Sequence, residues 1–522
     1  MTGSTLVDVV RGHAEQRGDA VAFTFEGRET SYAQFERNSN KAAHALAAAG
    51  LKAGDRIAYV GKNSDHYFEL LLGAMKIGVV MSPVNWRLAP PEMVYIIDNA
   101  EAKALLVGAE FVDVVRAFMS TLTSAPLLVA MEGNAAEWPA YEAWRDAEND
   151  AAPTFQPQLT DVALQLYTSG TTGHPKGAML SHRNLVDRRD EQSGELPPWN
   201  VWTADDVSLV AMPVFHIGGT GWGIVGLHSG AKGVVAREFD PSKVLDYFVN
   251  DRISKLFMVP AAMQFVVRHP RARQIDYSRL KYLLYGASPI PVDLLRECME
   301  VFGCGFVQMY GMTETTGTIV VLPPEDHTLD GSPRLRSAGK AVPGVELAIL
   351  DAEGRPLPPG EVGEIATRST ANMVGYWKLP EATASTLSAD NWLRTGDAGY
   401  MDADGYVYVH DRIKDMIISG AENIYPAEVE NAIFGHPAVA EVAVIGVPDD
   451  TWGEAVKAMV VRKPGAEVTA DDIIAHARTR IAGYKVPKSV DFIPALPRNG
   501  TGKILRRELR EPFWAGRERR VN

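Results

Sequence analysis

The sequence is poor in cysteine and has no long apolar run. Two cysteines among 522 residues, Cys298 and Cys304, cannot build a disulfide framework or a four-ligand metal site, so we expect structural thiols in a reducing compartment. The most apolar stretch, residues 70–81, is short and is interrupted by Lys76, and the N-terminus lacks the basic segment of a signal peptide. These shortages predict a cytoplasmic protein with no integral membrane span.

Positive charge is also in short supply. Lys and Arg total 52 against 65 Asp and Glu, a formal net charge of −13, which argues against a protein-wide surface for nucleic acid or anionic membrane. An anionic ligand must therefore be held by local donors. The composition is otherwise that of a globular protein, and 522 residues exceed what one hydrophobic core usually supports, so we expect at least two domains.

Helices and strands alternate along much of the chain. Strands are expected at 56–60, 79–84, 104–107, 161–167, 207–212, 233–236, 255–259 and 282–285, and helices at 32–49, 65–78 and 90–99. Such alternation predicts βαβ units and a parallel sheet, so the fold class is α/β.

The texture changes in the last third of the chain. Between residues 342 and 408, short segments punctuated by Gly and Pro predict a β-rich subdomain with tight turns. A compact α+β unit follows, with helices expected at 426–434 and 471–482. We predict a large N-terminal domain of residues 1–411, made of parallel α/β sheets and the β-rich subdomain, and a small C-terminal α+β domain of residues 412–522.

The most specific stretch covers residues 166–179, Leu-Tyr-Thr-Ser-Gly-Thr-Thr-Gly-His-Pro-Lys-Gly-Ala-Met. An apolar strand precedes it and a helix with Ser181 as N-cap follows, so we expect a loop between a strand and a helix. Glycines allow close backbone approach to an anion, hydroxyls donate hydrogen bonds and Lys176 adds a positive charge, which together suit phosphate binding. The usual P-loop differs, because there the lysine follows glycine and precedes Ser or Thr. A flexible polar turn is the alternative for a Gly/Ser/Thr run alone.

A second motif covers residues 308–315, Gln-Met-Tyr-Gly-Met-Thr-Glu-Thr, after an apolar Phe-Val pair. We expect it to leave the end of a strand, where open α/β sheets bind ligands. Tyr310 could stack on a base and Thr313 could donate to a phosphate. Glu314 could hold Mg²⁺, which takes one or two carboxylates with phosphate oxygens. A turn with an exposed glutamate is the alternative, and even as a metal ligand Glu314 is expected at the surface.

Two further residues carry chemistry in their local context. Asp397 could accept both hydroxyls of a ribose, although an aspartate after a glycine also occurs in ordinary turns. Lys503 lies in a glycine-containing segment, residues 497–504, from which a lysine could swing onto a reacting phosphate. Most loop lysines are simply solvated, which is the alternative for Lys503.

Taken in order, these segments resemble the signatures of the AMP-forming adenylating superfamily, which includes acyl-CoA synthetases, aryl-CoA ligases, luciferases and adenylation domains of peptide synthetases. The resemblance runs over nearly the whole chain, and it implies catalytic roles for Lys176, His216 and Lys503 and a Mg²⁺ site at Thr168 and Glu314. The residues that it implies for ATP binding are Thr168, Ser169, Gly170, Thr171, Thr172, Gly173, Lys176, Gly286, Ala287, Ser288, Gln308, Met309, Tyr310, Gly311, Met312, Thr313, Asp397, Arg412 and Lys503.

Residues 212–222 resemble the segment that lines the family's carboxylate pocket, with His216 as an aromatic gate. The resemblance implies an acyl pocket made by His216, Gly218, Gly219, Trp222, Gly286 and Met309. Gly218 removes bulk from this pocket, whereas Trp222 and Met309, where many relatives carry glycine, restore it. These residues define the acid substrate only as hydrophobic, so a fatty acid and an aryl-propenoate are both left as alternatives.

The hinge and the loop beside the CoA tunnel are implied at Lys414, Ser419, Gly420, Ala421 and Glu422. Ala421 replaces the commoner second glycine, and because alanine disfavours positive φ, we expect a stiffer loop. This departure is the one feature that weakens the case for transfer to CoA.

The resemblance implies an AMP-forming acyl-CoA ligase with ATP and CoA as co-substrates and Mg²⁺ as cofactor. A carboxylic acid first attacks ATP to give an acyl adenylate. The mobile small domain then turns about Lys414, and the CoA thiolate attacks the adenylate. No nucleic-acid partner is expected, and a homodimer is left open.

Three alternatives stand beside this interpretation. A stand-alone adenylation enzyme feeding a carrier protein usually anchors an amino group through an aspartate, which residues 215–222 lack, and no carrier domain follows. A nicotinamide-dependent oxidoreductase is indicated by residues 221–226, Gly-Trp-Gly-Ile-Val-Gly, with Glu238 and Asp240 downstream, although such a lone fingerprint is weak. A non-enzymatic adenylate-binding scaffold would require loss of a catalytic group, and all are present.

We expect Lys503→Ala to reduce adenylate formation by several orders of magnitude while transfer to CoA from a supplied acyl adenylate stays nearly intact. The reason is that a lysine on a mobile unit acts in only one of the two conformations. Single-turnover assays of the two half-reactions check this expectation. An equal loss in both would contradict the two-conformation scheme.

Overall fold

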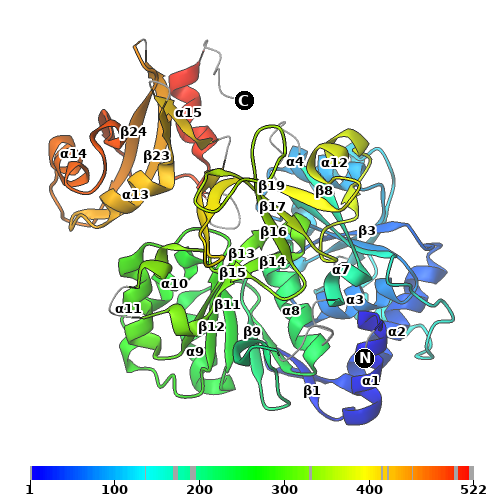
Figure 1. The fold of residues 1–522 in the computed structure, drawn as a ribbon. Coiled ribbons are helices and arrows are strands. Elements are labelled where there is room, and N and C mark those ends of the chain that lie inside the picture. The colour runs from blue at the N-terminus through cyan, green and yellow to red at the C-terminus, as the bar shows by residue number, and fades with distance from the viewer. Residues whose placement is uncertain are drawn as a thin grey trace.

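The computed structural model describes residues 3–133, 135, 137–168, 175–187, 196–328, 332–412, 415–419, 422–449, 451–498 and 504–515. Four sheets organise these residues, and the last of them forms a lobe of its own, orange and red in Figure 1. Two large, mostly parallel sheets share one hydrophobic core, to which Phe23 and Val307 contribute from one sheet and Ile57 and Leu164 from the other. The predicted α/β fold class is confirmed.

The first large sheet has seven strands in the order β18-β8-β7-β4-β3-β5-β6. They are β3 (Arg56–Val60), β4 (Val80–Val84), β5 (Ala102–Val107), β6 (Leu127–Ala130), β7 (Val162–Thr168), β8 (Lys176–Ser181) and β18 (Gly375–Tyr376). Strands β3 to β7 pair in parallel, and every residue of β3 and β4 is buried, as expected for strands covered on both faces.

Three of the six helices of this region begin at a serine cap. They are α2 (Tyr32–Ala48), α3 (Asp65–Met75), α4 (Pro90–Asn99), α5 (Val112–Phe118), α6 (Tyr141–Asp146) and α7 (His182–Val186). The side chains of Ser31, Ser64 and Ser181 accept backbone N–H groups at the starts of α2, α3 and α7, which satisfies donors that a helix start leaves open.

The second large sheet has nine strands in the order β15-β14-β13-β12-β11-β9-β10-β1-β2. They are β1 (Val21–Phe25), β2 (Arg28–Ser31), β9 (Val207–Val210), β10 (Lys232–Val235), β11 (Lys255–Met258), β12 (Tyr282–Gly286), β13 (Gly305–Met312), β14 (Gly317–Leu322) and β15 (Lys340–Ala341). Its helices are α1 (Leu6–Arg17), α8 (Ile217–Ser229), α9 (Pro241–Asp251), α10 (Pro260–Val267) and α11 (Val292–Phe302). The parallel run β1-β10-β9-β11-β12-β13 forms its centre.

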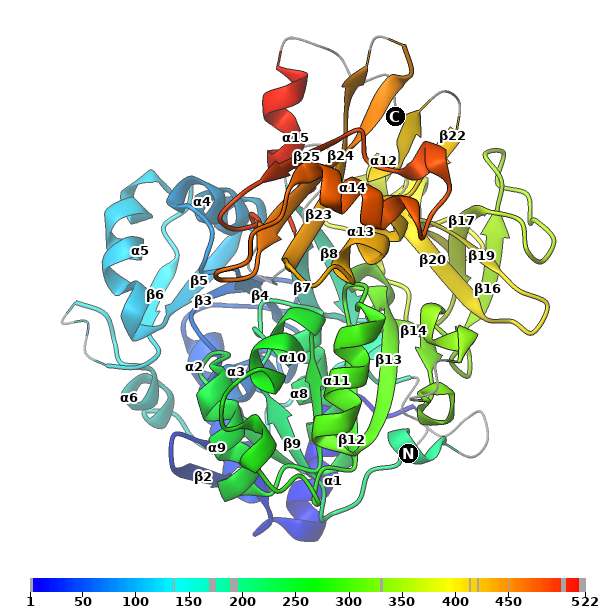
Figure 2. The same cartoon turned by 90° about the vertical axis from the view of Figure 1, so that its left-hand side faces the viewer.

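The predicted β-rich subdomain is confirmed as a four-stranded antiparallel sheet. Its strands, in the order β16-β17-β19-β20, are β16 (Glu346–Leu350), β17 (Gly363–Arg368), β19 (Trp392–Met401) and β20 (Val407–Arg412), and α12 (Pro380–Thr386) accompanies them. In Figure 2 these strands lie next to the C-terminal lobe.

The C-terminal lobe has a sheet and a core of its own. Its strands are β21 (Ile417–Ser419), β22 (Glu422–Ile424), β23 (Val439–Asp449), β24 (Gly453–Arg462) and β25 (Ser489–Phe492), and its helices are α13 (Pro426–Phe434), α14 (Ala470–Arg478) and α15 (Arg506–Trp514). Val429, Val444 and Ile473 are among its buried side chains. His410 of β20 stacks on Tyr425 before α13, with ring centroids 4.5 Å apart. The domain boundary after residue 411 stays a prediction.

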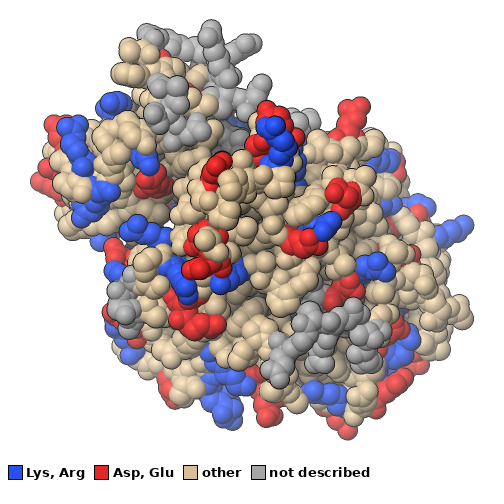
Figure 3. Space-filling model, viewed as in Figure 1, with Lys and Arg blue, Asp and Glu red and all other residues tan. Residues whose placement is uncertain are grey.

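None of the helices in the described ranges combines the length and the apolar character needed to cross a bilayer. On the face drawn in Figure 3, acidic and basic side chains are interspersed over the described residues.

Two local expectations need correction. Lys176–Ser181 is strand β8, antiparallel to β7, so the glycine-rich stretch does not lead from a strand directly into a helix. Ala178 and Leu180, two residues apart in β8, are both buried, which is the alternation expected of a strand. The neighbouring glycine obscures this pattern in the sequence. The second motif does not leave the end of a strand either, because β13 continues to Met312 and only Thr313–Thr315 form a 3-10 turn beyond it.

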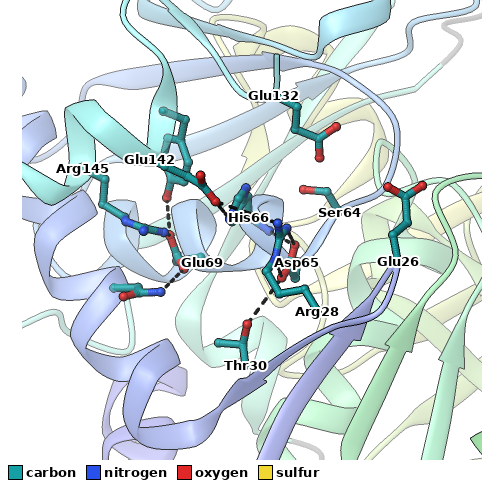
Figure 4. A network of polar contacts seen from close by, with 12 residues as sticks. Glu26, Arg28, Thr30, Ser64, Asp65, His66, Glu69, Glu132, Glu142 and Arg145 are labelled. Atoms are coloured by element: carbon teal, nitrogen blue, oxygen red, sulfur yellow. Dashed lines mark hydrogen bonds and ion pairs between the residues drawn. The ribbon is translucent and has the colours of Figure 1, made fainter. Parts of the chain in front are cut away.

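A buried polar network fastens α6 to α3 (Figure 4). The carboxylate of Glu69, whose side chain is 3% exposed, accepts hydrogen bonds from Nη1 of Arg145 at 2.6 Å and from the hydroxyl of Tyr141 at 2.9 Å. Nearby, Arg28 binds Asp65 through two hydrogen bonds of 3.0 and 2.6 Å. Each buried carboxylate is therefore compensated by an arginine.

We expect Arg145→Met to lower the free energy of unfolding by about 3 kcal/mol, because it leaves the charge of Glu69 buried without its partner. Arg116 makes comparable ion pairs with Asp113 and Glu137 at the surface, so Arg116→Met should leave stability nearly unchanged. Denaturant titrations followed by circular dichroism compare the two variants. Equal midpoints would show that the network adds nothing beyond surface pairing.

Candidate functional site

Residues from three distant segments meet at the carboxylate of Glu314. Glu314 is buried, and its Oε1 accepts hydrogen bonds from the hydroxyl of Thr168 at 3.2 Å and from that of Tyr376 at 2.8 Å. Thr168 ends β7, Tyr376 ends β18 and Glu314 follows β13, so the carboxylate joins the two large sheets. The surface position expected for Glu314 is wrong, because Tyr376 and Thr168 contact its carboxylate.

Lys176 lies over the ring of Tyr376. Its Nζ is 5.1 Å from the centroid of the Tyr376 ring, a cation–π geometry. A positive charge and a carboxylate thus flank one aromatic side chain. This arrangement can bind a phosphate group and, beside it, a metal ion.

Asp397 and Tyr310 form a second polar pair. Asp397 is buried in β19, and its Oδ2 accepts a hydrogen bond of 2.7 Å from the hydroxyl of Tyr310 in β13. Arg412 stands directly opposite Asp397 in the antiparallel register of β19 and β20. The structure therefore brings Tyr310 to Asp397, 87 positions later in the chain, and places the backbone of Arg412 beside Asp397.

The turn after β12 is strained. A Cβ atom at Gly286 would lie 2.0 Å from the carbonyl oxygen of Met309, so only glycine fits there. Ala287 follows with φ of +68°, a conformation that alanine rarely adopts, and Ser288 comes next. Strain of this kind is maintained at ligand-binding turns more often than elsewhere, which agrees with a site at this edge.

His216 stands immediately before α8, with its ring edge-on against Phe215 at a centroid distance of 4.5 Å. Burial, helped by the positive charge of Arg87, lowers the pKa of His216 to about 3, so the imidazole is neutral at physiological pH. Its Nε2 is buried and has no hydrogen-bond partner among the described residues. A buried nitrogen without a partner is uncommon, and a ligand would satisfy it.

An apolar cavity of about 190 Å³ opens between α8 and the ends of the parallel strands. The lining includes Leu185, Trp199, Trp202, Ile217, Gly218, Trp222, Val225, Phe257, Leu284, Ala287, Met309 and Gly311. No residue of this lining, within the described part of the chain, carries a charge. Such a cavity suits an apolar ligand, and its polar lining groups are the uncharged side chains of Asn184, Asn200, Thr316 and Thr318.

Three of the six residues expected to form the acyl pocket line this cavity, and the acyl pocket itself stays a prediction. Gly218, Trp222 and Met309 line the cavity, whereas Gly219 is packed against the backbone of Pro213 and Gly286 is covered by the carbonyl of Met309. His216 precedes the lining residue Ile217 but does not itself contribute.

Sequence analysis missed several residues of the site. Tyr376 belongs to none of the motifs, and only its contact with Glu314 shows its place. Trp199 and Trp202 lie in a segment between Pro198 and Thr203, where two tryptophans in a short loop could have been recognised as a buried wall. Phe257 is hidden in an ordinary strand.

Part of the predicted site falls outside the described residues, namely Ser169, Gly170, Thr171, Thr172, Gly173, Lys414, Gly420, Ala421 and Lys503. Ser419 pairs with Glu422 across the β21–β22 hairpin, next to Gly453 of β24. Gln308, Gly311 and Met312 lie in β13, and Thr313 begins the turn after it.

The structure removes the main support for a nicotinamide-dependent enzyme. Residues 221–226, which match the dinucleotide fingerprint, lie inside α8, with buried Gly223 packed on the ring of Phe68. A dinucleotide fingerprint requires these glycines in the turn between a strand and a helix. That alternative is therefore wrong.

Comparisons with known proteins identify the family of the chain. A family profile described as AMP-binding enzyme matches residues 10–377, and one described as AMP-binding enzyme C-terminal domain matches residues 428–503. The chain is 44% identical over 520 residues to a fatty acid–[acyl-carrier-protein] ligase, ScoC, of Streptomyces coeruleorubidus, with 99% of this chain and 98% of the relative covered. It is 40% identical over 505 residues to a feruloyl-CoA synthase of an Amycolatopsis species, with 95% and 96% covered.

A solved structure shows the same architecture. The crystal structure of ATP-bound MatB from Rhodopseudomonas palustris matches with a TM-score of 0.88 and 31% identity, over 98% of this chain and 99% of that one. Family profiles, relatives and fold point to one conclusion: the chain belongs to the AMP-binding enzyme family of adenylating ligases.

Proposed function

We propose that this protein is an ATP-dependent ligase that converts a hydrophobic carboxylic acid into an acyl adenylate and then into a thioester of coenzyme A, with release of pyrophosphate and AMP. One observation carries the proposal. Strand β13 lines the uncharged cavity with Met309 and Gly311, and the turn that follows it presents Glu314 to Thr168. A single strand thus connects an apolar acid site to a polar site suited to phosphates.

In the first step the carboxylate oxygen attacks the α-phosphorus of ATP, and pyrophosphate leaves. Lys176 offsets negative charge on the phosphates, and Asp397 accepts hydrogen bonds from the ribose. The carboxylate of the acid lies at the start of α8, where backbone N–H groups favour an anion and the unpartnered ring nitrogen of His216 is within the same segment. Lys503 places its charge on the α-phosphate.

Mg²⁺ would be held by Glu314 and the hydroxyl of Thr168. Glu314 Oε2 has no hydrogen-bond partner among the residues that the structure describes, and one carboxylate with phosphate oxygens is a ligand set that Mg²⁺ accepts. No group of three or more His, Cys, Asp or Glu side chains that could hold a metal ion occurs in the described ranges. The bound ion would neutralise charge on the phosphates.

The thiol acceptor in the second step is proposed to be CoA. The similarity to a feruloyl-CoA synthase supports CoA, and the described lining of the cavity has no carboxylate to pair with the amino group of an amino acid. A carrier protein is the second candidate, because the relative that is 44% identical is a fatty acid–[acyl-carrier-protein] ligase.

The test is acid-dependent pyrophosphate release over a panel of aliphatic and aromatic acids, without thiol, with CoA and with a phosphopantetheinylated carrier protein. We expect release to require a hydrophobic acid and to be accompanied by acyl-CoA when CoA is present. If a thioester formed only on the carrier protein, the thiol acceptor would be the carrier protein and not CoA. Release without any acid would contradict the proposed function.

We expect Glu314→Gln to raise the Mg²⁺ concentration needed for half-maximal activity and to weaken ATP use, because the amide loses the charge that binds the ion. The amide oxygen can still accept the hydrogen bonds of Thr168 and Tyr376, so the fold should persist. Mg²⁺ titrations of both proteins, with thermal unfolding as the control, check this. An unchanged titration curve would remove Glu314 from the metal site.

We expect Met309→Gly to raise kcat/KM for bulky aromatic acids relative to aliphatic ones by on the order of 10-fold. Met309 lines the cavity, and its flexible side chain can fold aside for a thin alkyl chain but not for a rigid ring. Cinnamate-type and medium-chain acids, assayed on the same preparation, give the ratio. A ratio that is flat or moves toward aliphatic acids would show that Met309 does not face the acyl group.

A further inference from the structure

A buried lysine lies behind the end of the apolar cavity that is remote from the phosphate side. Strands β11, β12 and β13 are parallel, and their register aligns Lys255 with Tyr282 and Gly305. Met309 is four residues further along β13, about 13 Å nearer to the phosphate side. Phe257 lies two residues after Lys255 on the same face of β11 and lines the cavity. Lys255 therefore lies two residues further from the phosphate side than Phe257, the residue of its strand that lines the cavity.

Lys255 is held by the segment that closes the cavity. Its side chain is 1% exposed, and its Nζ donates to the carbonyl of Val201 and lies 3.6 Å from the carboxylate of Asp206. The same Nζ is 4.3 Å from the centroid of the Trp202 ring. Asp206 also accepts the backbone N–H of Thr203 at 2.8 Å. The lysine thus fastens both ends of the segment 201–206 to the sheet.

Trp202 separates this charge from the cavity. It contributes to the lining, whereas Lys255 does not. Beside it lies Trp222 of α8, with ring centroids 5.5 Å apart, and the Trp222 indole N–H donates to the carbonyl of Leu209 at 3.1 Å. Trp202 therefore has a cation on one side and a fixed aromatic ring on another.

The charge of Lys255 makes a displacement of Trp202 unfavourable in free energy. Burial lowers the pKa of Lys255, and the charge of Asp206 opposes that shift. The charged form of Lys255 is therefore stabilised by its ion pair with Asp206. If the indole moved away, an alkyl chain would take its place against the ammonium group. Contact between a desolvated charge and an apolar chain is unfavourable, whereas the indole face attracts a cation.

We propose that Lys255 is a positioning residue for substrate length, because it holds Trp202 as the end wall of the acyl cavity and so restricts the enzyme to acids that stop short of that wall. The inference rests on the proposed function, since it assigns the cavity to the acyl group. It adds a specificity determinant that does not touch the substrate.

The test compares straight-chain acids of increasing length in wild type, Lys255→Met and Lys255→Gln, with pyrophosphate release as the assay. Methionine is of similar length and uncharged, and glutamine keeps a donor for Val201. Asp206 retains Lys281 at 2.7 Å and Ser254 at 2.8 Å in both variants, so its charge stays paired. We expect the ratio of kcat/KM for long over short acids to rise about tenfold, mainly through a lower KM for the long acids.

Two further variants make the outcome decisive. Lys281→Met removes the other lysine of Asp206, which is 48% exposed and does not line the cavity, so it should leave the ratio unchanged. Trp202→Ala removes the wall itself and should raise the ratio at least as much as the Lys255 variants. A raised ratio in Trp202→Ala alone would overturn the role of Lys255, and an unchanged ratio in Trp202→Ala would overturn the end wall. Absence of acid activation in wild type would instead refute the proposed function.

Discussion

The hydrogen bonds to the Glu314 carboxylate are the interactions on which the arrangement of the site depends. Thr168 comes from the seven-stranded sheet, Tyr376 from its edge strand, and Glu314 follows a strand of the nine-stranded sheet. A buried carboxylate must be satisfied by donors, so the two sheets are held at a spacing that places a charge between them. The pairing of β18 with β8 places Lys176 beside Tyr376.

The site has a polar part and an apolar part, and both include residues of β13. Its last residues and the following turn face polar partners, Asp397 through Tyr310 and Thr168 through Glu314. Met309, on the same strand, faces a cavity whose described lining is uncharged. A ligand with a charged head and an apolar body can satisfy both parts at once, which is the physical basis for combining a nucleotide with a hydrophobic acid.

The sequence predicted the polar half of the site better than the apolar half. Thr168, Glu314, Tyr310 and Asp397 lie in segments whose composition points to phosphate, metal or ribose chemistry, and the structure brings them together. The apolar wall has no such signature, because tryptophan and phenylalanine in a cavity lining look like ordinary core. Trp202 and Lys255 meet only through the tertiary fold.

The wrong predictions also arise where a local sequence pattern does not reveal the tertiary structure. Strand β8 was hidden by glycine, which weakens the alternation of strands, and the fingerprint at 221–226 matched a pattern while lying inside α8. Element type was predictable where the sequence shows a clear helical period, as in α2, or a short apolar run, as in β3. The burial of Glu314 was not, because the covering residue Tyr376 is distant in sequence.

The central claim is that the polar site and the apolar cavity form one site for an acyl adenylate. A crystal structure with a non-reactive acyl-sulfamate analogue of the adenylate, carrying a medium-length alkyl chain, tests it most directly. The account predicts the ribose on Asp397 and the alkyl chain in the cavity between Trp222 and Met309. An alkyl chain bound elsewhere, with this cavity empty, would contradict it.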